Sequence, residues 1–133
     1  MKIKMSEIIK FAKTPLGNKR FTPKMNLAIA INMATIEPYL KGFNDSCSKL
    51  MEEYMEKDAK GEAVLFEEED QKFYKLTDPK AFEKACGELE NEEVEVNIKT
   101  FDESELEKCG EKENMDIPSV SEITAMMFMI ERN

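Results

Sequence analysis

The chain has 133 residues, and its 28 acidic and 19 basic side chains give it a formal net charge of −9. This length suits one domain with one modest core, so we expect a single domain over residues 1–133. Histidine is absent, which excludes catalysis by a histidine base and the mixed Cys/His zinc sites. No apolar run approaches the ~20 residues of a membrane span, and the first residues do not form a secretory signal. We therefore expect a cytoplasmic protein without membrane contact.

The charges divide the sequence into a basic front and an acidic back. Residues 1–60 carry 11 Lys or Arg and 7 Asp or Glu, a net charge of +4, whereas residues 61–133 carry 8 and 21, a net charge of −13. The acidic back is either a well-solvated surface or a face that docks on a basic groove built to hold nucleic acid. Both interpretations stay open at this point.

The basic segment covers residues 1–21, where residues 2–5 predict a short strand and residues 6–12 a short amphipathic helix. Five basic side chains follow with no acidic residue among them: Lys10, Lys13, Lys19, Arg20 and Lys24. They form either a counterpart to the acidic back or a patch that contacts phosphates. Because no nucleic-acid-binding motif accompanies them, we expect no direct binding of nucleic acid.

Residues 22–60 predict one long helix, which begins at Thr22 and Pro23 and ends before Gly61. Apolar side chains recur every three or four residues along it and form one seam. Its first half is apolar nearly all round and is expected to be buried, and Pro38 in the middle predicts a kink. The seam of the second half packs either within the chain or against a second copy. The candidate residues for self-association are Phe43, Cys47, Leu50, Met51, Tyr54 and Met55.

Residues 61–133 form the acidic part. The apolar run at residues 63–66 and the aromatic-containing segment 72–76 predict a hairpin around Glu67–Asp70, and the alternating residues 93–99 predict a half-buried strand that joins it.

Three helix starts lie in the same part of the chain. Asp78 and Pro79 form one, and the pairs Asp102 with Glu105 and Ser119 with Glu122 predict capping boxes for two more helices. The expected fold is therefore α+β: a long kinked helix and a C-terminal helix packed on a small antiparallel sheet, which consists of the hairpin and one further strand.

The sequence carries no enzyme motif that we can identify. A phosphate loop, a dinucleotide-binding glycine pattern and a nucleophile elbow are all missing, and the run Glu67–Asp70 lacks the alternate spacing and the glycine of a calcium loop. Cys47, Cys86 and Cys109 are widely separated and are interpreted as free thiols. We therefore expect no enzyme, no catalytic residue, no metal and no cofactor. A carboxylate-dependent hydrolase is the least favoured alternative.

A resemblance rests on the order of these elements together with the segments 52–56 (Glu-Glu-Tyr-Met-Glu), 82–84 (Phe-Glu-Lys) and 89–96 (Leu-Glu-Asn-Glu-Glu-Val-Glu-Val), and on Gly61 and Ser119. In this pattern the chain is similar to a group of small phage and prophage proteins of unassigned function. The resemblance implies an origin in a phage genome and the cytoplasm of a bacterial host. It implies no catalytic residues.

The resemblance and the acidic back together favour a non-catalytic, anti-defence function, comparable to that of an anti-CRISPR protein. The chain would inhibit a host defence or nucleic-acid-binding protein by occupying its basic groove. The alternative is a virion or tail-assembly accessory protein that forms a homo-oligomer through the long helix. The predicted partner-binding residues are Glu67, Glu68, Glu69, Asp70, Glu88, Glu90, Glu92, Glu93 and Glu95.

Overall fold

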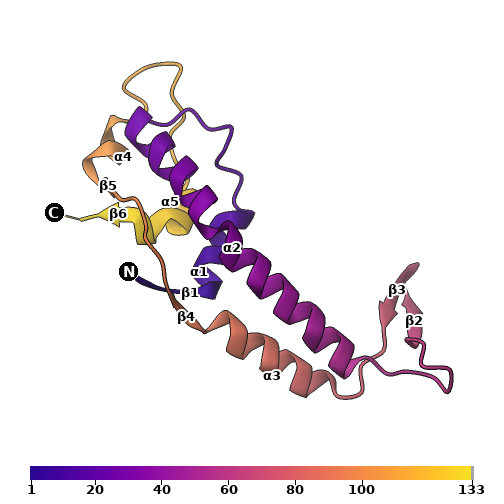
Figure 1. Cartoon of the computed structure of the whole chain (residues 1–133). Helices are drawn as coiled ribbons and strands as arrows, with labels where there is room; N and C mark the ends of the chain where they lie inside the picture. Colours follow the sequence, from indigo (N-terminus) through magenta and orange to yellow (C-terminus); the bar gives the residue numbers. More distant parts are fainter. Residues whose placement is uncertain (133) are drawn as a thin grey trace. The chain divides into compact units, whose positions relative to one another are not determined.

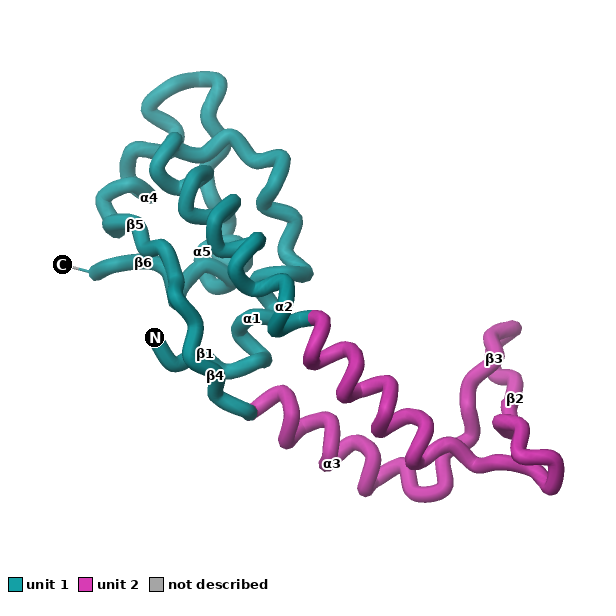
Figure 2. Tube along the Cα trace, in the orientation of Figure 1, with its two compact units in different colours: residues 1–40, 92–133 teal, residues 41–91 magenta. Residues whose placement is uncertain are grey.

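The chain folds into two compact units, as seen in a computed structural model that describes residues 1–132 (Figure 1). Unit 1 comprises residues 1–40 and 92–133, and unit 2 comprises residues 41–91 (Figure 2). The long helix α2 (Pro23–Tyr54) contributes its first part to unit 1 and its last part to unit 2. The expected α+β class is confirmed.

Unit 1 contains most of the secondary-structure elements. Besides α2 these are β1 (Lys2–Lys4), α1 (Met5–Lys13), β4 (Glu93–Glu95), β5 (Phe101–Asp102), α4 (Ser104–Lys108), α5 (Val120–Met126), the 3-10 turn η1 (Met127–Met129) and β6 (Ile130–Glu131). Among the residues that the structure describes, every buried side chain belongs to this unit. The core joins α1, α2 and the C-terminal segment: Phe11, Met25, Ile36 and Met126 are completely buried, and the Phe11 ring meets Phe128 edge-on at 5.4 Å.

Pro38 lies inside α2 and does not end it. It removes one backbone hydrogen bond, and it lies two residues before the boundary between the units. The helix begins where the sequence predicts, because the Thr22 hydroxyl accepts a hydrogen bond from the Met25 backbone N–H. The expectation that its first half is buried all round is wrong, since Leu27 is 56% and Ile31 40% exposed. The core covers only one face of this part of α2.

The expected strand pairing needs a correction. The third strand, β4, does not join the hairpin but pairs antiparallel with β1. Ile3 stands opposite Val94 in this pair, with the oppositely charged pairs Lys2–Glu95 and Lys4–Glu93 on either side. The opposite charges favour this register. β5 and β6 form a separate parallel pair.

The C-terminal helix begins as predicted. The Ser119 hydroxyl accepts from the Glu122 N–H, and the Glu122 carboxylate accepts from the Ser119 N–H, so the capping box is confirmed. The capping box predicted for α4 does not form. Asp102 accepts from the Ser104 N–H, and Glu105 instead binds the Lys108 ammonium at 2.7 Å.

Unit 2 consists of the end of α2, the helix α3 (Pro79–Glu90) and the predicted hairpin of β2 (Leu65–Glu68) and β3 (Gln71–Tyr74). Helix α2 ends at Tyr54, earlier than the expected position 60. The Asp58 carboxylate accepts from the Lys60 and Glu62 backbone N–H groups, and Gly61 has φ +81°. A turn therefore occupies the expected last helical turn, since an Asp side chain competes with helix formation by binding nearby backbone.

Candidate protein-binding surface

The hairpin holds four of the nine predicted partner-binding residues. Glu67 and Glu68 belong to β2, and Glu69 and Asp70 form the turn, with φ of 52° and 63°. Positive φ at both central residues is the pattern of a type I′ turn, which suits the twist of a hairpin. All four acidic residues are exposed, and Lys72, opposite Glu67, is the one basic residue in the two strands and their turn.

The other five predicted residues are divided between the units. Glu88 and Glu90 are exposed on α3 in unit 2. Glu92, Glu93 and Glu95 are exposed in unit 1, and the last two lie opposite lysines of β1. The terminal amino group of Met1 also binds the Glu95 carboxylate at 2.7 Å, and this hydrogen bond lowers the pKa of Glu95.

The hairpin also exposes large apolar side chains, which the sequence analysis did not assign to a surface. Leu65, Phe66, Phe73 and Tyr74 are between 42% and 50% exposed. Leu65 is paired with Tyr74, and Phe66 with Phe73, whose rings lie 5.7 Å apart. Because adjacent residues of a strand point to opposite faces, both faces of the hairpin are apolar near its base. This signal is visible in the sequence, because a two-stranded hairpin cannot bury both faces by itself.

A hollow of about 420 Å³ adjoins this hairpin. Its apolar lining comes from α2 and the hairpin, and includes Met51, Phe66 and Phe73. Glu68 and Lys72 are the charged residues of the lining. The hollow therefore combines exposed aromatic rings with the acidic part of the hairpin.

The predicted self-association seam is half-buried throughout unit 2. The Tyr54 ring meets Phe82 of α3 at 6.0 Å, and Cys47 has Cys86 of the same helix α3 as a neighbour. Burial, followed by the neighbouring Cys86, raises the pKa of Cys47. Met55 lies beyond the helix, in a bridge to Leu76. Helix α3 thus covers part of the seam, and its role in self-association stays a prediction.

The basic residues of the N-terminal segment contact the C-terminal part of unit 1. Lys19 pairs with Glu122 at 3.5 Å, and the Arg20 backbone N–H donates to the Asp116 carboxylate at 2.7 Å. The Arg20 contact is made by the backbone, so only the Lys19–Glu122 ion pair, among these two contacts, favours the alternative of a counterpart to acidic residues within the chain.

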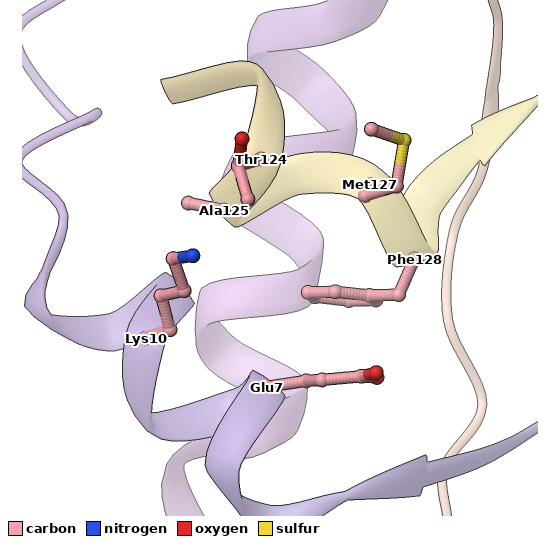
Figure 3. A pocket seen from close by; sticks show the side chains of 6 residues that line it. All are labelled: Glu7, Lys10, Thr124, Ala125, Met127 and Phe128. Carbon is pink, nitrogen blue, oxygen red and sulfur yellow. The ribbon is translucent and has the colours of Figure 1, made fainter. Parts of the chain in front are cut away.

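A second hollow, of about 410 Å³, lies between α1 and the C-terminal segment of unit 1 (Figure 3). Glu7 and Lys10 line it from α1, and Thr124, Ala125, Met127 and Phe128 line it from the other side. The Thr124 hydroxyl donates to the Val120 carbonyl at 2.7 Å. The lining is mixed in polarity and lies next to no acidic cluster, so we do not assign the binding surface to it.

No protein-family model, curated protein or solved structure matches the chain. Within residues 1–132, no helix is both long and apolar enough to cross a membrane. In the same part of the chain, no three Cys, Asp or Glu side chains gather in a way that could hold a metal ion. The three cysteines are free thiols, with Cys109 buried.

Proposed function

We propose that the chain acts by binding another protein, without catalysing a reaction, and that the acidic hairpin of unit 2 is the main contact. One observation carries the proposal: four large apolar side chains and four carboxylates are exposed together on ten residues. Apolar surface rimmed by charge is typical of protein interaction sites.

The charge of this surface supports a basic partner. Unit 2 has 14 acidic residues and 8 lysines, which leaves a net charge of −6 on residues 41–91. A negative surface accelerates association with a positive one and disfavours partners of like charge. Proteins that bind nucleic acid do so with basic surfaces that contact the phosphates, and such a surface complements the charge of unit 2. We infer a phage-type inhibitor that occupies a basic groove on a host defence or nucleic-acid-binding protein in the bacterial cytoplasm.

A charge-reversal variant tests this function. The tagged chain is used to capture its partner from bacterial lysate, and the Kd for the purified partner is measured between about 0.1 M and 1 M salt, over which the screening length falls from about 10 to 3 Å. We expect Glu67→Lys with Glu68→Lys to weaken binding roughly tenfold or more, and the partner to lose nucleic acid when the native chain binds. The matched control is Glu111→Lys with Glu113→Lys, which reverses two exposed charges in unit 1. Equal affinity of the hairpin variant and the control would refute the proposal.

The alternative, a virion or tail-assembly accessory protein, is supported by the incomplete cover of the seam. No side chain of unit 2 is buried, and Phe43 and Leu50 are half-exposed despite the neighbouring α3. Sedimentation separates the two functions: an assembly protein is an oligomer whose state changes in Phe43→Asp, whereas a strictly monomeric chain excludes self-association through the seam.

A further inference from the structure

The hollow beside the hairpin has an apolar lining with little competition from polar groups. Besides the two phenylalanines, Met51, Tyr74 and Leu76 contribute to its walls. The hollow has room for a side chain, since about 420 Å³ is many times the roughly 30 Å³ that one water occupies. An occupant must therefore present an apolar or planar body to these walls.

The charges around the hollow favour a cation. Glu68 and Lys72 both line it and offset each other in charge, and the same hairpin carries three further carboxylates and no other basic residue. An anionic side chain would be repelled by this surface, whereas a cation gains from it.

Among cationic side chains, arginine fits these walls better than lysine. A guanidinium is planar and weakly hydrated, stacks on aromatic faces, and binds a carboxylate through two parallel hydrogen bonds. A lysine ammonium is strongly hydrated and offers only a point charge. The Phe66 and Phe73 rings supply the aromatic faces, and Glu68 supplies the carboxylate.

We propose that this hollow binds an arginine side chain of a basic segment on the partner protein. The inference rests on the proposed function and specifies what the acidic hairpin recognises. Charge alone would treat arginine and lysine alike, so a preference for arginine is the property that separates the hollow from the acidic surface around it.

Two labelled peptides of nine residues, one all arginine and one all lysine, test the preference by fluorescence anisotropy against the full chain. We expect the arginine peptide to bind roughly two- to fivefold tighter, the preference that one exposed cation–π contact supports. Phe66→Leu with Phe73→Leu keeps the apolar character and every carboxylate, and should reduce the ratio of the two Kd values to about one. A ratio near one in the native chain, or an unchanged ratio in this variant, would overturn the inference.

The two proposals fail separately in this assay. Glu67→Lys with Glu69→Lys reverses two exposed charges of the hairpin and keeps Glu68, the carboxylate of the arginine site. If this variant weakens both peptides while the native ratio is one, the acidic surface stands and the arginine site is wrong. If the native preference persists but this variant binds both peptides as the native chain does, the arginine site stands and the wider acidic contact is wrong.

A second measurement avoids the hairpin variants, which could unfold locally. In the native chain with ¹³C-labelled methionine methyl groups, the Met51 resonance, assigned with Met51→Leu, should shift on addition of the arginine peptide. Met127, which is 40% exposed in unit 1, provides the control resonance. An unmoved Met51 resonance at saturating peptide contradicts the site.

Discussion

Asn32 is the most completely buried polar residue that the structure describes in unit 1. It lies in the first half of α2 and is completely buried. Its side-chain Nδ2 donates to the Lys99 carbonyl at 2.8 Å, and its Oδ1 accepts from the Lys99 N–H at 2.8 Å. Nδ2 also lies 3.4 Å from the Met129 sulfur. One amide thus fixes the segment after β4 and touches the C-terminal turn.

Replacing Asn32 with leucine keeps the branched shape of the side chain at a somewhat larger volume, and it leaves the Lys99 carbonyl and N–H without their hydrogen-bond partners. Each backbone group left unsatisfied costs about 1–3 kcal/mol, and Lys99 is exposed enough for water to offset part of this. We therefore expect Asn32→Leu to lower the free energy of unfolding by about 2–4 kcal/mol. Asn32→Asp should cost more at neutral pH, because its second oxygen would face the Lys99 carbonyl as a buried charge.

Urea unfolding, monitored by far-UV circular dichroism, measures the stability of both variants. The urea midpoints are compared where the dependence of the unfolding free energy on urea (the m-value) is unchanged. The control is Asn44→Leu, an exposed position of the same helix, which should change stability by no more than about 0.5 kcal/mol. If Asn32→Leu is as stable as this control, the amide does not hold the Lys99 segment and the reasoning is refuted.

Three further predictions follow from single contacts. The hydrogen bond from Lys108 lowers the pKa of Glu105, so the unfolded carboxylate binds protons first and stability should fall as the pH drops below about 4.3. In thermal unfolding between about pH 3 and 7, Glu105→Gln should flatten this loss, and an unchanged pH profile would disprove the role of the pair. Asp70→Gly should slow hydrogen exchange in the hairpin by stabilising the turn by up to about 1 kcal/mol, because glycine adopts positive φ without strain; Asp70→Ala, which removes the same charge, should bring no such gain. Burial raises the pKa of Cys109, which is 8% exposed, so it should react with a disulfide reagent more slowly than the half-exposed Cys86; equal rates in the folded chain would contradict its burial.

The local signals of the sequence predict the elements well. The cap at Asp78, the capping box at Ser119 and the hairpin are all where the residues indicate, since each depends on neighbours within a few positions. The predicted pairing of β4 with the hairpin was wrong. The alternation of apolar and polar residues identifies a strand but not its partner, and 90 residues lie between Val94 and its partner residue Ile3 in the sequence. Asn32 was missed although its signal was present: it is a polar residue within the most apolar stretch of the helix.

Only the acidic part of the candidate surface could be predicted from the sequence, because the apolar part depends on contacts between distant segments. Four adjacent acidic residues are visible in the sequence, but the exposure of Phe66 and Phe73 depends on which elements the hairpin packs against. The two helices of unit 2 are joined by the 24 residues between Tyr54 and Pro79, whereas helix–helix connections in bundles usually take about 2–8 residues. If this segment served only to connect the two helices, it would need neither its additional residues nor its solvent-exposed apolar side chains. The surplus length, with its aromatic pair and its carboxylates, is therefore the strongest reason to place the binding surface on the hairpin rather than on the two acidic residues of β4, both of which lie opposite lysines.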